Sequence, residues 1–520
     1  MKSGKSKDPD SYVSELFKEG VIGDDLKESV LMLMNRIKNE MSVPEGLRRA
    51  NITILHKKGN KLDLNNWRGI FVSSVLRTIL MKLVYDRTYE IVASNMTDAQ
   101  IGARKNKSVR NHLFILNSII SDVMSAKKKD PIDLNIMDFK QMFDAEEIQT
   151  VLNSFYDAGI QNDLFAVVYE ANKSVDFAVK TPTGMTDLGT IRNKIMQGDV
   201  LSPLMSSNMV DQHIRKGALN SKNTYMYKNK VEIPPLMMQD DTLAVSVCEI
   251  NTIKMNTFIN TRSNVMGLQF GRDKCVQMHI GKRQNSNICS NCKVSAWTER
   301  VLTSHEGKHQ LQDQYIGEEV MKQVQEKKYL GDIISHDMKN TLNLKAKTNR
   351  AIGIVKKIST SLYEQPYGRN TYRAAILMRE SLLLGSMLSN SESWINITKL
   401  DLDLLEKPDS MVHRNVLSDY GNPSKVFMFL ELGTIPVRYV MMEKRLKFLR
   451  YILNESMTSM IRQVFEVQKL DSRKGDFCEL IKKDLNDLNI EMNDEEIKSF
   501  SKSQWKNMFI QKQNLLHLIF

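Results

Sequence analysis

Three aspartates in two separate stretches of the chain have the clearest capacity for chemistry. Asp138 follows the apolar–polar alternation of residues 132–136, and the pair Asp240-Asp241 precedes the alternating residues 243–247. Because alternation with a period of two is typical of a strand, we expect one strand to end where Asp138 begins and a hairpin turn to carry the acidic pair. Two neighbouring strands of this kind would bring three carboxylates together.

Converging carboxylates repel one another unless a cation lies between them, and their hard oxygen atoms suit Mg²⁺. Two such ions can bind the attacking and leaving oxygens of an in-line phosphoryl transfer. The acidic pair by itself also fits a solvated turn, since aspartates are common in turns for purely local reasons. The flanking motifs are therefore needed to separate a catalytic site from an ordinary turn.

Five motifs follow one another between residues 138 and 332. They are Asp138-x-x-x-x-Phe143-Asp144, Met196-Gln197-Gly198-Asp199-Val200-Leu201-Ser202-Pro203, Gln239-Asp240-Asp241, Gly271-Arg272-Asp273-Lys274 and Tyr329-Leu330-Gly331-Asp332. In this order they resemble the palm motifs of a reverse transcriptase, specifically that of a non-LTR (LINE-type) retrotransposon. The resemblance extends upstream to Pro44 and, more loosely, downstream to the end of the chain.

This resemblance implies an α/β (α+β) fold: a right-hand polymerase with fingers, a mixed α/β palm, a helical thumb and helical flanks. We expect an N-terminal helical extension over 1–43, fingers and palm over 44–335, a thumb over 336–460 and a C-terminal helical extension over 461–520. The implied activity is RNA-directed DNA polymerisation. Its partners would be an RNA template, a DNA primer, the RNA–DNA hybrid and dNTPs.

The resemblance also implies roles for individual residues. The three aspartates Asp138, Asp240 and Asp241 match those that bind two Mg²⁺ ions, for which Mn²⁺ substitutes. Further matched positions imply contacts with the nucleotide or its template: Arg68, Arg104, Phe143, Gln197 and Lys274. A last motif, Tyr329-Leu330-Gly331, resembles the primer grip, a hairpin that supports the primer 3′ end.

The nucleotide-binding residues would act in different ways. Arg68 and Arg104 would grip triphosphate oxygens, because the planar guanidinium group binds phosphate through two parallel hydrogen bonds. Phe143 would crowd a ribose 2′-hydroxyl, although a core phenylalanine is the alternative. Gln197 would lie at the nascent base pair and template strand. Lys274 would lie near the departing pyrophosphate and act as its general acid, with an ordinary exposed lysine as the alternative.

Periodicity in the sequence predicts the elements that must position these residues. Helical spacing of apolar residues extends over 25–40, 113–123, 148–155, 253–259, 342–363, 369–388 and 437–453, and Ser202-Pro203 begins a further helix. A strand over 50–56 leads into a hairpin whose basic tip contains Lys57, Lys58 and Lys61, and another short strand covers 175–179. Residues 400–520 are expected to be helical, and their sequence indicates no chemistry.

The four residues Cys289, Cys292, His305 and His309 have the spacing of a tetrahedral zinc finger, with twelve residues between the second cysteine and the first histidine. Ala296 occupies the usual phenylalanine position of such a finger. The family resemblance aligns this stretch with a variable linker that commonly lacks these histidines. We therefore favour a linker here, with a zinc site as the open alternative.

Composition narrows the class of protein. The 520 residues suffice for several subdomains, and the excess of 73 lysines and arginines over 61 aspartates and glutamates favours a polyanionic partner. No run reaches the roughly 18 apolar residues of a membrane span, and the first eight residues lack the apolar core that is typical of a secretory signal. An odd count of five cysteines argues for reduced thiols. We expect a soluble, intracellular protein without membrane contacts, located in the nucleus on the basis of the resemblance.

Two other classes of protein stay open. A catalytically inactive, retrotransposon-derived nucleic-acid-binding protein is suggested by Ala103 and by Met238-Gln239, which replace a phenylalanine and an aromatic-alanine pair of the family motifs. An RNA-dependent RNA polymerase would share the palm, but Phe143 disfavours it. The endonuclease of similar retrotransposon proteins is not recognisable in this sequence, so a separate domain or protein would supply it. The natural template, the insertion target and the oligomeric state are left open.

Overall fold

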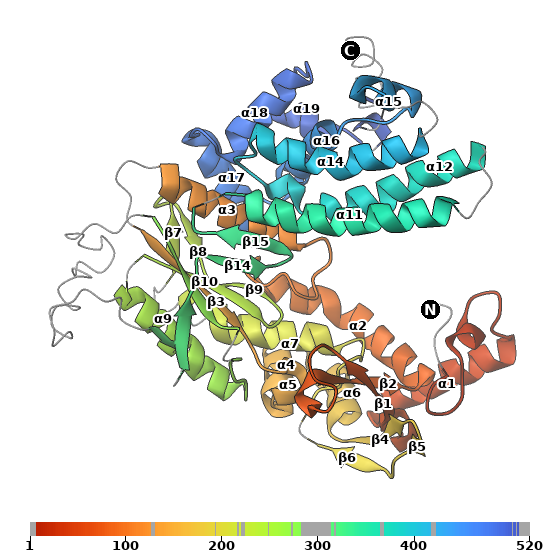
Figure 1. The fold of residues 1–520 in the computed structure, drawn as a ribbon. Coiled ribbons are helices and arrows are strands. Elements are labelled where there is room, and N and C mark those ends of the chain that lie inside the picture. The colour runs from red at the N-terminus through yellow and green to blue at the C-terminus, as the bar shows by residue number, and fades with distance from the viewer. Residues whose placement is uncertain are drawn as a thin grey trace.

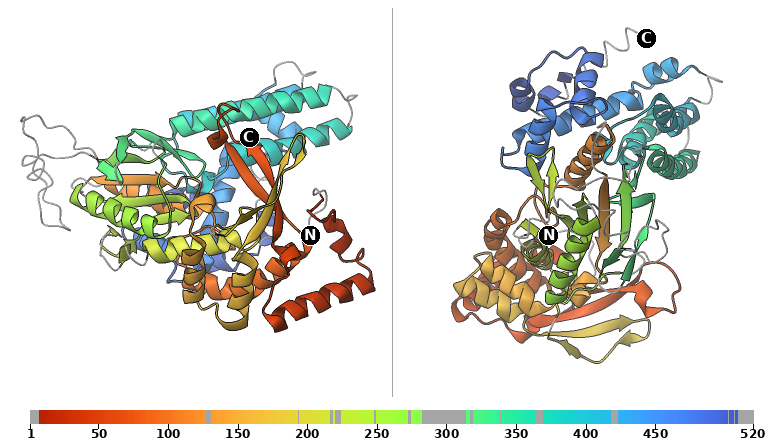
Figure 2. Two further views of the ribbon diagram at one scale, coloured as in Figure 1. Left: turned by 90° about the horizontal axis from the view of Figure 1, so that it is seen from below. Right: turned by 90° about the vertical axis from the view of Figure 1, so that its left-hand side faces the viewer.

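The structure is a computed structural model of the 520-residue chain. It describes residues 7–508, except for 126–130, 193, 216–217, 220–223, 248, 272–273, 282–313, 317–318, 338, 364–368, 418–422, 502 and 506. The chain has a mixed α/β fold in which a sheet at the centre joins two lobes (Figures 1 and 2).

A six-stranded sheet with the order β12-β13-β11-β3-β10-β9 forms this centre. Its strands are β3 (Ile132–Asp138), β9 (Leu236–Met238), β10 (Asp241–Ser246), β11 (Val276–Ile280), β12 (Gln314–Ile316) and β13 (Glu319–Gln323). The helices α3 (Val109–Ser125) and α9 (Glu249–Val265) pack against it. The predicted strand at 132–136 is confirmed, but Asp138 is its last residue instead of the residue that follows it.

Strand β3 is buried on both of its faces, although its sequence alternates between apolar and polar residues. The polar side chains are paired within the sheet: His279 Nδ1 lies 2.8 Å from Asp133 Oδ1, and Asn135 Nδ2 donates to Ser246 Oγ at 3.2 Å. A buried polar group without such a partner would cost free energy. The alternation of apolar and polar residues in β3 therefore means that one face of the strand is apolar and the other polar, and both faces are buried.

A smaller sheet and several helices form the lobe that lies lowest in Figure 1. The sheet has the order β2-β1-β4-β5, with β6 also on β4. Its strands are β1 (Arg49–His56), β2 (Trp67–Ser73), β4 (Val175–Thr181), β5 (Gly184–Met185) and β6 (Gly189–Ile191). The α-helices of this lobe are α1 (Asp24–Glu40), α2 (Val75–Asn95), α4 (Met142–Ala145), α5 (Ile148–Asp157), α6 (Asn162–Asn172) and α7 (Ser202–Val210). The predicted hairpin, the strand at 175–179 and the helix after Ser202 are confirmed.

The upper lobe is helical. Its elements are α11 (Thr341–Tyr363), α12 (Arg369–Met378), a π-helical segment (Arg379–Leu384), α13 (Gly385–Met387), α14 (Lys399–Val416), α15 (Lys425–Glu431), α16 (Val437–Asn454), α17 (Met460–Leu470), α18 (Phe477–Asp487) and α19 (Asp494–Ser499). Two small hairpins, β7 (Tyr225–Tyr227) with β8 (Val231–Ile233) and β14 (Glu326–Tyr329) with β15 (Asp332–Ser335), lie between this lobe and the large sheet. The helices predicted at 342–363 and 437–453 are confirmed.

Short helical turns complete the described chain: Ser14–Phe17, Glu45–Arg48, Leu64–Asn66, Asp211–Arg215 and Ser391–Ser393. Within the described ranges, every helix is too short or too polar to span a bilayer. Cys275 and Cys478, the cysteines that those ranges include, are buried and reduced.

The C-terminal helices share their core with the centre of the molecule. Phe477 on α18 contacts Phe114 of α3, with ring centroids 5.1 Å apart, and Phe448 of α16 contacts the same ring at 5.9 Å. One apolar cluster continues from Met34 to Trp505. The residues that we assigned to a C-terminal extension after 460 therefore pack directly on α3.

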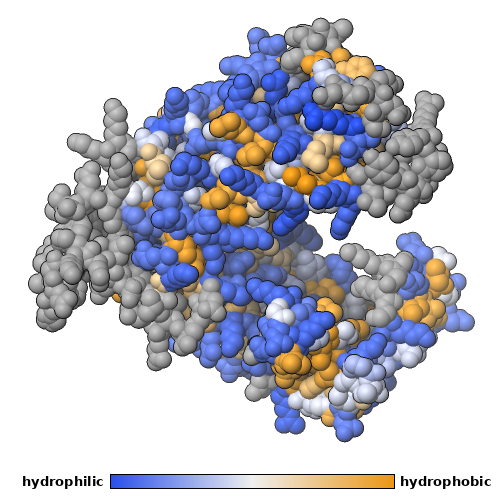
Figure 3. Space-filling model, in the orientation of Figure 1, coloured by the Kyte–Doolittle hydropathy of each residue, from blue (hydrophilic) through white to orange (hydrophobic). Residues whose placement is uncertain are grey.

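Between the two lobes lies a groove that opens to the right in Figure 3. The inner end of this groove is formed by the large sheet and the hairpin β14–β15, and α11 lies along its upper side (Figure 1). The hairpin β14–β15 is attached to the upper lobe by a buried ion pair, since Lys347 Nζ on α11 lies 2.8 Å from Asp332 Oδ1. Trp394 Nε1 donates to the other oxygen of Asp332 at 2.8 Å.

Candidate active site

Two neighbouring strands bring the three aspartates to one end of the large sheet. Strands β3 and β10 are antiparallel, and their register places Asp241 directly opposite Asp138. On its other side Asp241 pairs with Met238, so Gln239 and Asp240 form the two-residue turn of the hairpin β9–β10. The predicted hairpin is present and its strand β10 pairs with β3, but the turn carries only Asp240, because Asp241 is the first residue of β10.

The acidic groups lie close enough for their charges to raise the pKa values of Asp240 and Asp241. Burial raises the pKa of Asp240, and the charge of Asp138 raises it further. Burial also raises the pKa of Asp241, which reaches about 6 with the added repulsion from Asp240 and Asp138. A cation bound between these groups would relieve this repulsion. The acidic cluster therefore favours the binding of a cation.

Lysine and arginine side chains surround the acidic cluster. Lys274, which is largely exposed, contacts Asp138 Oδ1 through its ammonium group. Burial lowers the pKa of Lys57, and the charges of Arg68 and Lys274 lower it further, so these three cations lie near one another. Asp144 lies beside them. Burial raises the pKa of Asp144, and the charges of Lys57 and Arg68 oppose that shift.

The donor set of this cluster fits Mg²⁺ in chemical type, because carboxylate oxygens are its usual protein ligands. Asp138, Asp240 and Asp241 are the residues that would bind it. In the part of the chain that the structure describes, no group of three or more acidic, histidine or cysteine side chains is arranged around a single metal position. Asp138 is ion-paired with Lys274 instead.

The basic tip of the β1–β2 hairpin supplies Lys57 and Arg68, which lie next to the acidic cluster. Register pairs Leu55 with Arg68, and Lys57 N donates to Asn66 O at 2.8 Å, so the strands stay paired up to the tip. Lys58 and Lys61 are exposed on the same tip. The hairpin therefore carries cations from the lower lobe to the carboxylates of the large sheet.

Arg104 does not join the other predicted phosphate-binding residues. Its guanidinium group donates to Thr97 O at 2.7 Å and to Asp98 Oδ1 at 3.2 Å, and only 14% of its side chain is exposed. Asp98 is also bonded to Lys107 and Ser459. Arg104 thus binds within the loop before α3, and Asp98 connects that loop to Ser459 before α17.

The Gln197-Gly198 motif packs against the smaller sheet. Phe71 N of β2 donates to Gln197 O at 2.9 Å. Gly198 has a φ of +118°, and a Cβ atom at this position would lie 2.7 Å from Phe71 O. In the structure, the group that approaches it closely is the backbone of β2.

Phe143 lies in the short helix α4, just after β3, and its ring is half-buried against the central core. The hairpin β14–β15 brings the predicted primer-grip residues to the same region. Leu330 and Gly331 form its turn with φ values of +46° and +92°. Tyr329 is buried, and burial followed by the charge of Asp241 raises the pKa of its hydroxyl. The effect of the Asp241 charge on this pKa shows that Tyr329 lies near the acidic cluster.

The proposed zinc ligands Cys289, Cys292, His305 and His309 lie outside the described residues. Two other residues of the site were missed in the sequence. Glu146 is fully buried, Ser206 Oγ donates to its Oε2 at 2.6 Å, and burial raises its pKa to about 8, with Ser206 opposing the shift and Asp240 adding to it. Glu146 stands beside the exposed Glu147, and no pattern in the sequence indicates that it is buried.

Gln100 is the second residue whose role the sequence did not indicate. Its side chain is fully buried, and its Oε1 atom accepts hydrogen bonds from the backbone N–H groups of Gly102 and Gln239. In the sequence, Gln100 and Gly102 form a Gln-x-Gly motif just before Arg104. Only the structure shows that this motif contacts the turn that carries Asp240.

No protein-family model and no curated protein matches this sequence. Solved structures with some similarity are telomerases from Candida species. A telomerase from Candida tropicalis in complex with a fragment of telomeric RNA has 12% identity and a TM-score of 0.43, and the alignment covers 94% of this chain and 68% of the other. The corresponding Candida albicans complex has 11% identity and a TM-score of 0.42, covering 88% and 68%.

An apo telomerase from Candida tropicalis, truncated from the C-terminal domain, matches with 13% identity and a TM-score of 0.36. The alignment covers 50% of this chain, which spans 57% of that telomerase chain. Similarity at this level does not establish a shared activity, so the function has to be argued from the residues of the site.

Proposed function

We propose that this protein is an RNA-directed DNA polymerase of the reverse transcriptase type, similar to those of non-LTR retrotransposons. The observation that carries the proposal is the register of β3 and β10, which pairs Asp138 with Asp241 and leaves Asp240 in the adjoining turn. Together with the order of the five sequence motifs, this arrangement fits nucleotidyl transfer better than an ordinary acidic turn.

In this proposal the lower lobe around β1, β2 and β4 corresponds to the fingers, the six-stranded sheet to the palm and the helices from α11 onward to the thumb. The hairpin β14–β15 corresponds to the primer grip. Its buried ion pair between Asp332 and Lys347 fixes the hairpin to α11. A primer resting on the hairpin would therefore be held in a fixed position relative to the acidic cluster.

Asp138, Asp240 and Asp241 would bind Mg²⁺, or Mn²⁺ in its place, and the metal would neutralise the charge of the phosphates. Lys57, Arg68 and Lys274 would bind the triphosphate of the incoming dNTP, because their positive charges lie beside the carboxylates. The primer 3′-oxygen then attacks the α-phosphate and pyrophosphate leaves. Positioning and charge neutralisation supply most of the rate in such reactions. Phe143, near this position, favours deoxynucleotides by crowding a 2′-hydroxyl.

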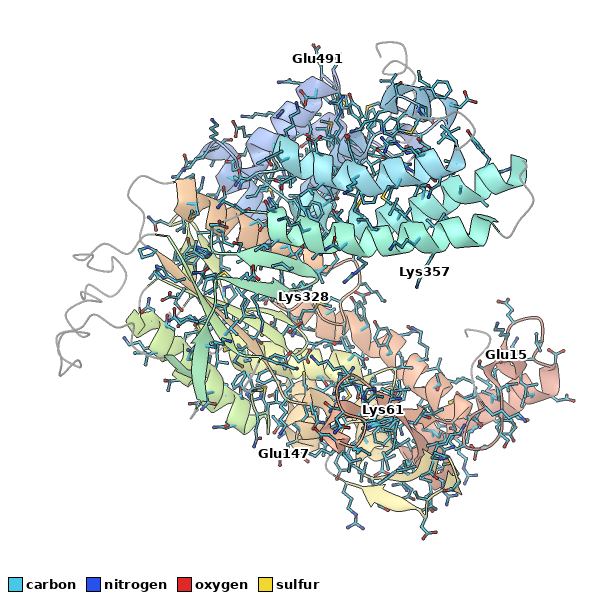
Figure 4. All side chains as sticks on the ribbon, in the orientation of Figure 1. Glu15, Lys61, Glu147, Lys328, Lys357 and Glu491 are labelled. Atoms are coloured by element: carbon cyan, nitrogen blue, oxygen red, sulfur yellow. The ribbon has the colours of Figure 1, made fainter. Side chains whose placement is uncertain are left out.

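The groove between the lobes would hold the RNA–DNA hybrid. Four exposed cations lie along α11: Lys345, Arg350, Lys356 and Lys357. Figure 4 shows Lys357 projecting from α11 toward the lower lobe, while Lys328 lies at the inner end of the groove. Contacts of this kind bind phosphates with little regard to sequence and weaken as salt is raised.

A second candidate function is nucleic-acid binding without catalysis. One observation favours it: Lys274 forms an ion pair with Asp138, which is one of the proposed metal ligands. Retrotransposon origin would also imply an endonuclease, which we assign to a separate domain or protein. A nuclear location would follow from the same origin.

Primer extension on an RNA template tests the proposal. We expect the wild-type protein to extend a DNA primer with dNTPs in Mg²⁺. Asp138→Asn and Asp240→Asn should each lower the rate by at least about a thousandfold, because each removes a metal ligand at the reacting centre, while hybrid binding changes less than about twofold. Asp187→Asn, an exposed change far from the cluster in the chain, is the matched control.

The outcome separates the two candidate functions. Wild-type protein that is folded and binds the hybrid but makes no DNA in either Mg²⁺ or Mn²⁺ would leave only the non-catalytic function. Extension that survives Asp240→Asn would exclude the acidic cluster as the active site.

A further inference from the structure

The turn that carries Asp240 has a strained backbone. Gln239 is its first residue and has a φ of +56°, in the left-handed region that side chains other than glycine rarely adopt. Asp241 and Met238 close the turn on either side. A residue in this conformation needs support from its surroundings, because an extended or right-handed backbone would otherwise be favoured.

Residues 99–102 supply that support from a distant part of the chain. Met237 N donates to Ala99 O at 2.6 Å, and Ile101 N donates to Met237 O at 3.0 Å, so this segment covers the edge of β9. The Gln100 side chain continues the contact into the turn. Its Oε1 atom accepts from Gln239 N at 3.0 Å and from Gly102 N at 2.8 Å.

Gly102 makes this approach possible. A Cβ atom at residue 102 would lie 2.7 Å from both the backbone nitrogen and Cγ of Gln239, and 2.8 Å from Gln100 Oε1. No side chain fits in that space. Gln100 is fully buried, so its carboxamide oxygen is held in place as the acceptor for Gln239 N.

We infer that Gln100 is a positioning residue of the acidic cluster: by holding the backbone of Gln239 in its left-handed conformation, it sets the direction of the Asp240 carboxylate. Gln100 acts through the turn and has no contact with the reacting groups. The inference deepens the proposed polymerase function and rests on it for the role of Asp240, whereas the contact itself can be tested without any activity.

Hydrogen–deuterium exchange tests the contact. Gln100→Met has a similar length and no strong acceptor, so the peptide covering 236–246 should exchange faster than in wild type, while peptides from the upper lobe are unchanged. Mn²⁺ affinity, followed by electron paramagnetic resonance, should fall by at least about fivefold. Gln149→Met, at an exposed glutamine on α5, is the matched control and should change neither measurement.

The catalytic consequence should appear in kcat and not in KM for the template and primer. We expect Gln100→Met to lower kcat by at least about tenfold, equivalent to about 1.4 kcal/mol, with hybrid binding unchanged. Gln100→Glu keeps an acceptor oxygen and should retain more activity than Gln100→Met.

A double variant separates positioning from general stability. Glycine adopts a positive φ without strain, so Gln239→Gly should restore most of the Mn²⁺ affinity and kcat lost in Gln100→Met. A purely structural role of Gln100 would leave the double variant as impaired as the single one. Unchanged exchange, or faster exchange with unchanged Mn²⁺ affinity, would overturn the inference. If wild type makes no DNA but Gln100→Met still loses Mn²⁺, the polymerase proposal fails and the positioning role stands.

Discussion

Glu146 places an ionisable group in the core next to the acidic cluster. Its pKa is raised by burial from 4.5 to about 8, while the hydroxyl of Ser206 opposes the shift and the charge of Asp240 adds to it. Between these two pH values the folded chain keeps the proton, whereas the unfolded chain releases it. The contribution of Glu146 to the free energy of unfolding must therefore fall as pH rises from about 4.5 to about 8 and then level off.

We expect Glu146→Gln, which cannot ionise, to lose this part of the pH dependence. The difference in unfolding free energy between the variant and wild type should grow by up to about 1.4 kcal/mol per pH unit across that window. Denaturant unfolding at pH 5, 6, 7, 8 and 9 measures it. Glu147→Gln changes an exposed neighbour and is the matched control. A constant difference between Glu146→Gln and wild type at all five pH values would contradict the buried, protonated carboxyl group.

Residue identity could be predicted from the sequence more easily than residue environment. The three aspartates and Arg68 were found because their types and their order match a known set of motifs, and the structure brings all four into one region. The ion pair of Arg104 with Asp98 was missed, because a local motif does not show which distant group a side chain meets. Glu146 was missed for the same reason.

At the scale of elements, Gly198 joins the segment before α7 to strand β2. Its φ of +118° and the position of Phe71 O, 2.7 Å from a Cβ atom, leave no room for alanine. We expect Gly198→Ala to lower the free energy of unfolding by about 1–3 kcal/mol or more, measured by urea denaturation. The hydrogen bond between Phe71 and Gln197 spans the same junction. We therefore expect Gly198→Ala to slow primer extension on an RNA template as well.

A second glycine provides the control. Gly353 lies within α11 with no heavy atom within 4 Å of a Cβ position, and alanine favours a helix. Gly353→Ala should therefore leave stability unchanged or raise it by up to about 1 kcal/mol. Equal losses in the two variants would mean that Gly198 is not held against β2.

Most elements were predictable because their apolar spacing is regular. The predictions agree with the structure within a few residues for two strands, at 50–56 and 175–179, and for the helix at 148–155. Helix α6 (Asn162–Asn172) was not predicted as a separate helix. The alternation in strand β3 did not show that both of its faces are covered, where Asn135 Nδ2 donates to Ser246 Oγ and Asp133 contacts His279.

On the scale of the whole molecule, the C-terminal helices and the central helix α3 form one continuous core. Phe477 is 1% exposed and contacts the rings of Phe114 and Phe448. We expect Phe477→Ala to lower the free energy of unfolding by about 3–5 kcal/mol and to shift a single calorimetric transition as a unit. Leu470→Ala, at a side chain that is 76% exposed, should stay within about 0.5 kcal/mol of wild type.

The number of transitions is the decisive reading. If the helices after residue 460 formed an independent domain, Phe477→Ala would split the calorimetric trace into two transitions and leave the second one unshifted. The sequence could not predict this continuity, because helical periodicity identifies an apolar face but not the element that covers it.

The pairing of β3 with β10 joins two stretches that are about a hundred residues apart in the chain. The hairpin β9–β10 can close within microseconds, but its docking on β3 must wait until that long loop has lost much of its conformational entropy. Bringing Asp138 beside the acidic pair therefore has an entropic cost that slows folding. The repulsion among the three carboxylates adds to the free-energy cost of the same step, because it arises only when the two strands meet.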